Sequence, residues 1–348
     1  MPDLFEWSPI REATFYEALG ERKVRCTACA HYCIIHDGLR GICGVRENRG
    51  GRLYSLVHGK AVACEVEPIE KKPFYHFHPG ARAYSIATAG CNLHCRFCQN
   101  WQISQIHKSD FVPGFRLLPE EVVRSAREEK CRVIAYTYTE PTIFLEYALE
   151  TAALAAREGL SNVFVSNGYY TTEALEAMAP LIDAVNIDLK SFRDSYYRRI
   201  CGAVLQPVLD SIERSLRKGM WVEVTTLVVT GLNDSSEELR DVARYLAGLS
   251  RDIPWHVSRF FPAYRLTDRE PTPEKTLRRA RDIGEEEGLH HVYVGNLPGE
   301  PEDTLCPDCG EVLLERSDLR LLANHLRKGA CPRCSRPLAG VGLASQAT

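Results

Sequence analysis

Three cysteines lie close together in the chain, with a spacing that suits iron–sulfur chemistry. Cys91, Cys95 and Cys98 form the pattern C-x3-C-x2-C directly after the apolar run of residues 83–88. Cysteine thiolates hold iron–sulfur clusters, so three on one loop can bind three irons of a 4Fe–4S cube. The fourth iron then has no protein ligand and is open to a small molecule, which indicates chemistry at iron beyond electron transfer. The alternative is a zinc knuckle, but three thiolates alone make a poor closed tetrahedral zinc site.

Two further groups of cysteines flank this loop. The C-terminal group has the spacing of two zinc knuckles and predicts a structural zinc ion. Its members are Cys306, Cys309, Cys331 and Cys334. The N-terminal group also predicts a metal site, with zinc as the first choice and an auxiliary iron–sulfur cluster as the second, because four thiolates bind either metal. Its members are Cys26, Cys29, Cys33 and Cys43.

The composition is that of an ordinary globular protein, not of a coat for nucleic acid or membrane. The 348 residues are 45% hydrophobic and 26% charged, with a formal net charge of −3. The sequence has no apolar run long enough to span a bilayer, and residues 1–7 lack the pattern of a secretory signal. Of fourteen cysteines, only Cys64, Cys131 and Cys201 stand outside the three groups, which indicates metal sites in a reducing compartment. We therefore expect a cytoplasmic protein.

Short apolar runs alternate with amphipathic stretches between residues 83 and 296, which predicts repeated βαβ units and a parallel sheet. The expected strands cover residues 84–88, 133–138, 163–166, 184–189, 222–229, 256–260 and 292–294. The expected helices cover residues 119–130, 142–158, 172–178, 207–218, 235–249 and 273–287. The simplest α/β fold is a partial barrel of the (β/α) TIM type with about six or seven strands.

We expect four parts along the chain. Residues 1–80 form an N-terminal four-cysteine module with lead-in strands, 81–300 the partial barrel, 301–340 a C-terminal zinc ribbon and 341–348 a flexible tail. In parallel barrels the chemistry gathers on the loops that follow the strands. Besides the cysteine loop, these positions carry the candidate site residues Tyr138, Thr139, Glu140, Asn167, Gly168, Asp188 and Lys190.

Together these segments resemble the radical S-adenosylmethionine (radical SAM) enzymes, in the branch of the pyruvate formate-lyase-activating enzyme. The resemblance rests on residues 91–101, 135–142, 166–169 and 186–190. Over residues 20–340 the chain looks more closely like the radical SAM member of the AmmeMemoRadiSam system. The resemblance implies that S-adenosylmethionine binds the open iron and that one electron cleaves it to a 5′-deoxyadenosyl radical, which abstracts hydrogen from the substrate.

The resemblance also implies cofactor contacts at the first strand ends, and each has a structural alternative. Phe97 lies near the adenine or packs in the core. Tyr138, Thr139 and Glu140 stand where the activating enzymes have a Gly-Gly-Glu-Pro turn that holds the methionine amino group. Glu140 is alternatively an ordinary cap for the helix that begins near Thr142.

Four further candidates lie at later strands. Asn167 and Gly168 contact the cofactor or form only a tight turn. Asp188 and Lys190 alternate along a strand and so face the same side, where they touch the cofactor or form a salt bridge in the barrel floor. His256 is a cofactor contact or a satisfied core histidine.

The sequence thus predicts an enzyme that abstracts hydrogen from a protein, as glycyl-radical activating enzymes do, or from a small molecule. It needs a reductant such as a flavodoxin or ferredoxin, and the resemblance implies association with Memo-like and AMMECR-like proteins. The alternative is a zinc-ribbon protein that binds nucleic acid or modifies RNA. Residues 306–348 carry six Lys and Arg against four Asp and Glu, a local charge of +2 that falls short of a basic footprint. A pure electron-transfer protein is a third class, against which the open iron and the full barrel argue.

Overall fold

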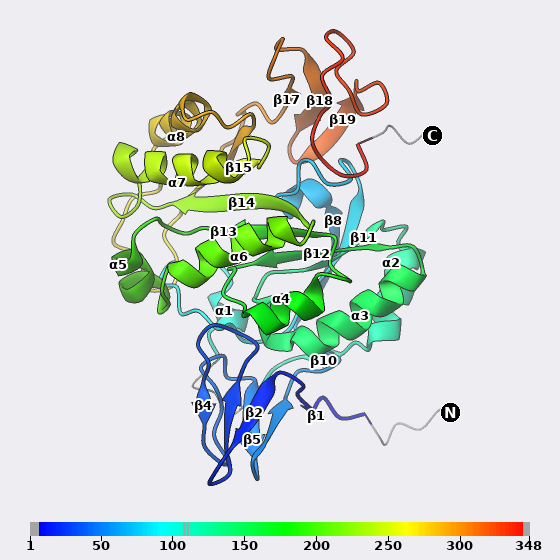
Figure 1. The fold of residues 1–348 in the computed structure, drawn as a ribbon, viewed down its shortest axis with the longest axis vertical. Helices are drawn as coiled ribbons and strands as arrows, with labels where there is room; N and C mark the ends of the chain where they lie inside the picture. Colours follow the sequence, from blue (N-terminus) through cyan, green and yellow to red (C-terminus); the bar gives the residue numbers. More distant parts are fainter. Residues whose placement is uncertain (1–6, 107–108, 110, 344–348) are drawn as a thin grey trace.

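The computed structural model describes residues 7–106, 109 and 111–343, and it has three parts along its longest axis (Figure 1). The N-terminal part lies at one end, the C-terminal part at the other, and a larger α/β part between them. Residues 344–348 of the expected tail lie outside the described residues, as do residues 1–6.

The central part is built on one open, eight-stranded sheet. Its strands lie in the order β16, β15, β14, β13, β12, β11, β9 and β8. Seven are parallel, at the expected positions: β9 (Arg82–Ala87), β11 (Val133–Tyr136), β12 (Ser161–Ser166), β13 (Ala184–Asp188), β14 (Trp221–Val228), β15 (Trp255–Arg259) and β16 (Val292–Gly295). Since β16 and β8 form the two edges, the sheet is a partial barrel, which confirms the expected fold class.

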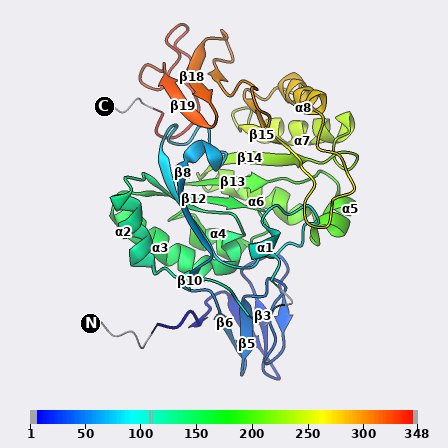
Figure 2. The same ribbon diagram turned by 180° about the vertical axis from the view of Figure 1, so that it is seen from behind.

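Helices cover one face of this sheet, as Figures 1 and 2 show from opposite sides. They are α2 (Pro119–Glu128), α3 (Leu145–Arg157), α4 (Thr172–Met178), α6 (Gln206–Arg217), α7 (Ser236–Leu249) and α8 (Glu274–Glu286), each within a few residues of an expected helix. Their amphipathic pattern explains the arrangement: in α2, Val122, Val123 and Ala126 are buried while Glu120 and Arg124 are exposed. No helix in the described ranges is long and apolar enough to cross a membrane.

The sequence pattern does not predict several shorter elements of the central part. Strand β8 (Ala63–Pro68) extends the sheet beyond β9 as an antiparallel edge. A one-turn helix α5 (Asp194–Tyr196) continues into a π-helical turn η3 (Tyr197–Cys201). The remaining elements are β7 (Lys60–Ala61), η1 (Ile69–Lys71), α1 (Trp101–Ser104), β10 (Phe115–Arg116) and the 3-10 turn η2 (Pro141–Phe144).

The N-terminal part consists of two three-stranded antiparallel sheets, β1–β6–β5 and β2–β3–β4. The strands are β1 (Arg11–Glu12), β2 (Tyr16–Leu19), β3 (Lys23–Cys26), β4 (Ile34–Ile35), β5 (Arg46–Arg49) and β6 (Arg52–Ser55). Val24, Ile35 and Leu53 form its small core. The buried guanidinium of Arg46 attaches this part to the barrel by donating from Nη1 to Oε1 of Glu146 in α3 at 3.0 Å.

The C-terminal part is a three-stranded antiparallel sheet of β17 (Thr304–Leu305), β18 (Val312–Ser317) and β19 (Arg320–Asn324). It packs against the segment that precedes β9. Arg316 donates from Nη2 to the Tyr75 carbonyl at 2.6 Å, and His76 Nδ1 lies 2.8 Å from the Ala339 carbonyl. The hydroxyl of Tyr293 in β16 lies 2.7 Å from His76 Nε2, so one histidine joins the barrel to this part.

Candidate functional site

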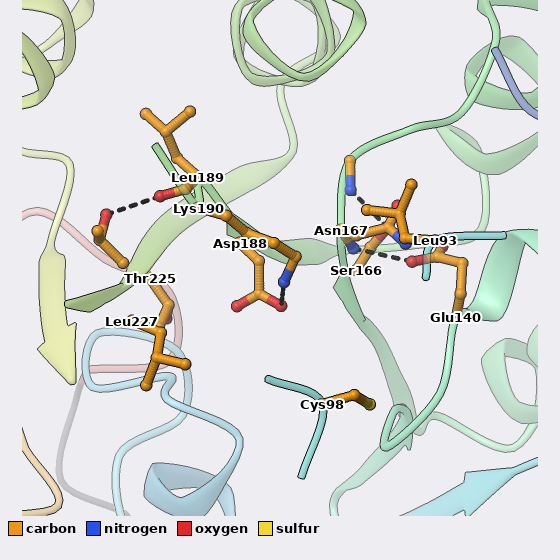
Figure 3. A network of polar contacts seen from close by, with 12 residues as sticks. Leu93, Cys98, Glu140, Ser166, Asn167, Asp188, Leu189, Lys190, Thr225 and Leu227 are labelled. Carbon is orange, nitrogen blue, oxygen red and sulfur yellow. Dashed lines mark hydrogen bonds and ion pairs between the residues drawn. The ribbon is translucent and has the colours of Figure 1, made fainter. Parts of the chain in front are cut away.

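A cavity of about 340 Å³ opens at the ends of the parallel strands, within the size range of small-molecule sites. Most of the residues expected to bind a cluster or cofactor line it. They are Cys91, Cys95, Phe97, Cys98, Tyr138, Thr139, Glu140, Asn167, Asp188 and Lys190. Figure 3 shows several of these side chains arriving from different strands. Of the expected set, only Gly168 and His256 do not line the cavity.

The three cysteines of the loop lie together on one wall. Cys95 is buried, while Cys91 and Cys98 are partly buried. The Leu93 N–H donates to Cys91 Sγ at 3.4 Å, and the Ser104 hydroxyl lies 3.2 Å from Cys98 Sγ. Burial raises the pKa of Cys91 and of Cys98. Burial therefore favours the neutral form of these two thiols, and a bound cation such as iron would favour their thiolates.

A further thiol, Cys201, lies behind this wall at the end of η3. Its hydrogen bond to Cys95 lowers the pKa of Cys95, while burial raises the pKa of Cys201 itself. The His94 N–H donates to the Cys201 carbonyl at 2.8 Å, so the turn and the loop are joined through their backbones. Cys201 does not line the cavity, which makes it a partner of the Cys95 sulfur and not a ligand from the cavity side. In the sequence, Cys201 stands outside the three cysteine groups. The only local sign of the turn is the glycine that follows it, Gly202, which adopts a left-handed conformation with φ of +73°.

Tyr138 and Thr139 form a tight turn against the cysteine loop. Tyr138 has φ of +62°, a left-handed conformation that costs a non-glycine residue roughly 1–2 kcal/mol. Asn100 Nδ2 donates to the Tyr138 carbonyl at 2.7 Å, and the Thr139 hydroxyl donates to the Thr88 carbonyl at 2.9 Å. The Tyr138 hydroxyl donates to Glu67 at 2.5 Å, so both its backbone and its side chain are held.

Glu140 is buried, and both of its carboxylate oxygens are hydrogen-bonded. Oε1 accepts from the N–H and hydroxyl of Thr142 at 3.0 and 2.5 Å and from the Ser166 hydroxyl at 2.9 Å. Oε2 accepts from the Asn167 N–H at 2.8 Å. Glu140 therefore caps η2, as the structural alternative predicts, and joins the ends of β11 and β12 (Figure 3). Burial raises its pKa despite these donors. Glu140 lines the cavity, and Oε2, which accepts one hydrogen bond, can accept a second.

Asn167 and Gly168, which follow β12, have different environments. Asn167 Nδ2 donates to Asn92 Oδ1 at 2.7 Å and lies 3.9 Å from Cys91 Sγ, so it contacts the cysteine loop. Gly168 lies away from the cavity with φ of +70°, and a Cβ there would lie 2.7 Å from Ile187 Cγ2. The glycine is therefore required by the turn and its packing, and the structure does not bring it to a cofactor.

Asp188 and Lys190 form an ion pair at the cavity, with Nζ 2.8 Å from Oδ2 (Figure 3). Both side chains lie at the rim, not in the barrel floor. Burial disfavours the charge of Lys190, but the Asp188 carboxylate and the neighbouring cysteines raise its pKa well above the usual value. Lys190 Nζ also lies 5.9 Å from the centre of the buried Phe97 ring. The pair thus presents a carboxylate and an ammonium beside the cysteine wall.

His256 lies deeper in the barrel, away from the cavity. Its Nε2 is 2.7 Å from Glu223 Oε2, and Glu223 also accepts from the N–H groups of Tyr75 and His76. His256 is therefore a core histidine with a hydrogen-bond partner, and it does not line the cavity. Thr225 and Ser258, two residues farther along the same strands, line the cavity instead.

The C-terminal cysteines have the geometry of a metal-binding module. All four sulfurs lie within 4.8 Å of one another, with Cys306–Cys334 at 3.5 Å and Cys309–Cys331 at 3.6 Å. A zinc–sulfur bond of about 2.3 Å in a tetrahedron places neighbouring sulfurs about 3.8 Å apart. The site is therefore compatible with a metal ion. The N-terminal cysteines line a separate, smaller cavity beside the cysteine loop.

Comparisons with known proteins match a family model and several relatives. The model of the Radical SAM superfamily matches residues 85–246, from β9 into α7, and this range includes the cysteine loop. The uncharacterized protein MJ0808 of Methanocaldococcus jannaschii is 46% identical over 309 residues, which cover 88% of this chain and 92% of that protein. The putative glycyl-radical enzyme activating enzyme MJ1227 of the same organism is 25% identical over 174 residues, 48% of this chain and 69% of that protein. Among solved structures, a radical SAM methyltransferase from Sphaerobacter thermophilus has a TM-score of 0.48 and 17% identity, over 68% of this chain and 71% of that one.

Proposed function

On the premise that residues 85–246 match the model of the Radical SAM superfamily, we propose that this chain abstracts a hydrogen atom from its substrate by means of a 4Fe–4S cluster and S-adenosylmethionine. The observation that carries the proposal is the convergence of three thiols on one wall of a cavity whose other walls present an ion pair and a turn. The fit is chemical as well as spatial, because thiolates are the ligands that hold the irons of such a cluster.

Cys91, Cys95 and Cys98 would hold three irons of the cluster, with the fourth iron facing the cavity. Cys201 remains behind Cys95 and leaves that corner open. Bound there, the cluster and S-adenosylmethionine would supply a 5′-deoxyadenosyl radical. The role of the surrounding residues is to hold the cofactor and exclude water.

The cavity offers complementary groups to each part of S-adenosylmethionine. The free acceptor position of Glu140 suits the methionine ammonium, and the turn at Tyr138 and Thr139 borders the same space. The Asp188–Lys190 pair can bind polar groups of the cofactor, since a carboxylate accepts from hydroxyls and an ammonium donates to a carboxylate. Asn167 and Phe97 complete the wall beside the cysteines.

The substrate would enter from an adjoining hollow of about 820 Å³, which shares Gln99 and Leu227 with the cavity. A glycyl residue of a partner protein is our first choice of hydrogen donor, supported by the name of the M. jannaschii relative, and a small molecule is the second. A flavodoxin or ferredoxin would supply the electron. The same proposal includes zinc in the C-terminal quartet and module boundaries near residues 80 and 300. It also includes a cytoplasmic location and association with Memo-like and AMMECR-like proteins.

The test is anaerobic incubation of the reconstituted protein with dithionite and S-adenosylmethionine, with 5′-deoxyadenosine measured by mass spectrometry. Cys95→Ala should lose both the visible absorbance of the cluster and the cleavage. Cys131→Ala is the matched control, because Cys131 is a buried thiol that does not line the cavity. Cleavage by Cys95→Ala at the native rate would contradict the ligand assignment. Deuterium transfer from labelled candidate substrates would then identify the hydrogen donor.

A further inference from the structure

The four N-terminal cysteines enclose a common cavity although they come from separated positions in the chain. Cys26, Cys29, Cys33 and Cys43 all line it. Three of them are buried and Cys33 is partly buried. Four buried or partly buried thiols around one cavity form a ligand set for a metal ion or a cluster.

The spacing of these sulfurs differs from that of the C-terminal quartet. Among the described residues, only the C-terminal quartet brings three or more ligand atoms within 4.8 Å of one another. Zinc requires such closeness, because all four sulfurs bind one ion at about 2.3 Å. A 4Fe–4S cube separates its thiolates, since each binds a different iron. The N-terminal quartet shares its wider spacing with the loop of Cys91, Cys95 and Cys98, where the cysteine pattern belongs to a cluster.

A buried amide group at the same cavity lacks a partner. Asn92 is 1% exposed and lines the cavity, and its Nδ2 has no hydrogen-bond partner. Its Oδ1 is already engaged with Asn167. A cube offers inorganic sulfides and thiolates as acceptors for such a donor, and hydrogen bonds to sulfur are among the factors that set a cluster's potential. Zinc-bound thiolates also accept hydrogen bonds, so the Asn92 donor indicates a bound group with acceptor sulfurs, and the separation of the sulfurs favours the cube.

The quartet also lies directly against the cysteine loop. Gly90 has φ of +99°, and a Cβ there would lie 2.7 Å from the Cys43 carbonyl oxygen. The His31 ring bonds the Asn92 carbonyl at 2.8 Å. The residues on both sides of Cys91 therefore contact the N-terminal module. Cys33 itself is only partly buried, so this corner of the quartet lies nearest the surface, where an external donor can approach it.

We propose that Cys26, Cys29, Cys33 and Cys43 hold a second 4Fe–4S cluster, bound at all four corners, which passes electrons to the cluster of the cysteine loop. This reverses the preference for zinc at the N-terminal quartet. One electron from a ferredoxin-class donor reduces the second cluster, and the same electron then moves to the first, so the second cluster returns to its oxidised state. The metal assignment stands by itself, whereas the relay rests on the proposed function.

The metal assignment is tested by counting metals in a variant that leaves the quartet intact. Anaerobically purified Cys91→Ala/Cys95→Ala/Cys98→Ala should retain about four irons and four sulfides per chain, against about eight of each in the unaltered protein. Cys29→Ala/Cys43→Ala should also fall to about four, and Cys64→Ala should keep about eight. An iron-free triple variant with two zinc ions per chain would overturn the assignment. Because the triple variant does not touch the quartet, misfolding of the N-terminal variant leaves this test valid.

The relay, which is the transfer of electrons from the second cluster to the first, is tested by electron paramagnetic resonance and by the choice of electron donor. In the fully reduced protein, interaction between the two spins should broaden the spectrum beyond the sum of the two variants' spectra. With ferredoxin as donor, 5′-deoxyadenosine formation by Cys29→Ala/Cys43→Ala should be largely lost, while dithionite, which can reduce the first cluster directly, should largely restore it. A spectrum equal to the sum, or an equal loss with both donors, would refute the relay. Absence of 5′-deoxyadenosine from the unaltered protein would instead contradict the proposed function and leave the iron counts untouched.

Discussion

Individual residues make the three thiols of the cysteine loop unequal. Burial raises the pKa of Cys91 and of Cys98, whereas the hydrogen bond from Cys201 lowers the pKa of Cys95. A donor to a thiolate favours the more negative, reduced state of a cluster and so raises its reduction potential. Sequence spacing predicted the three ligands but not this partner, because Cys201 lies far along the chain and no pattern links it to Cys95.

We predict that Cys201→Ala lowers the reduction potential of the cluster held by the cysteine loop. A hydrogen bond to a charged group that is about 1 kcal/mol stronger in the reduced state corresponds to about 40 mV for one electron. A redox titration followed by electron paramagnetic resonance measures the shift. Cys64→Ala, at a thiol that does not line the cavity, should leave the potential unchanged. Equal potentials for Cys201→Ala and the unaltered protein would show that the thiol does not act on Cys95.

The Asp188–Lys190 pair gives a second prediction for single residues. Asp188→Asn should retain the cluster but bind S-adenosylmethionine at least about tenfold more weakly, because a charge-assisted hydrogen bond contributes about 1.5–3 kcal/mol. Equilibrium dialysis of the oxidised protein measures the affinity without turnover. Asp194→Asn, at a carboxylate on the nearby helix α5 that does not line the cavity, is the control. Unchanged affinity would remove Asp188 from the cofactor site.

Whole elements are the level at which sequence and structure agree best. The seven parallel strands and the six long helices were predictable because apolar periodicity is a local property of each segment. Strand β8 was not predicted, because its residues are mostly half-exposed and it pairs antiparallel with β9. The turn η3 was not predicted, because backbone hydrogen bonds to the cysteine loop hold it in place, as between His94 and Cys201. Tertiary contacts decide such elements, so their own sequence carries little signal.

Glu140 acts at this scale, since it joins the ends of β11 and β12. Glu140→Gln should destabilise the cluster-free protein by about 1–3 kcal/mol. The new NH2 group replaces an oxygen that accepts a hydrogen bond from the N–H of Thr142 or of Asn167, so two donors would face each other. Urea unfolding of the cluster-free form measures the loss. Glu128→Gln, at the exposed end of α2, should have a negligible effect. Equal stability of the two variants would mean that the four hydrogen bonds to Glu140 contribute little.

The arrangement of the three parts is a property of the whole molecule, and it was not predictable from sequence. The contacts that place the C-terminal part join residues more than two hundred positions apart, as between Arg316 and Tyr75 or Ala339 and His76. No periodicity encodes such pairings. The spacing of the C-terminal cysteines did predict a metal module. The N-terminal spacing favoured zinc over an iron–sulfur cluster, and the separation of the sulfurs, which the sequence does not encode, is the reason for our proposal of a cluster.

His76 makes the attachment of the C-terminal part sensitive to acid. Burial lowers the pKa of His76 to about 3, below the value of about 6.5 in an unfolded chain. The contribution of neutral His76 to the free energy of unfolding is therefore complete above about pH 6.5. It is lost as the pH falls towards 3, by up to about 1.4 kcal/mol per pH unit. The protection factors of residues 304–343 in hydrogen exchange, which correct for the intrinsic pH dependence of amide exchange, should fall between pH 7 and pH 5.

The matched variants separate this effect from general acid sensitivity. His76→Asn, which cannot take up a proton in this range, should flatten the pH dependence of exchange. His325→Gln, at an exposed histidine in the same part, should retain it. If both variants followed the unaltered protein, protonation of His76 would not control the attachment.

Each parallel strand of the central sheet pairs with the strand that immediately precedes it in this series. During translation the parallel strands are therefore synthesised in the order in which they pair, so each new strand has its neighbour already available. The loop of Cys91 emerges early, whereas Lys190, Thr225 and Ser258 follow much later. A nascent chain thus exposes its thiols to metals and oxidants well before the chamber that shields them is complete.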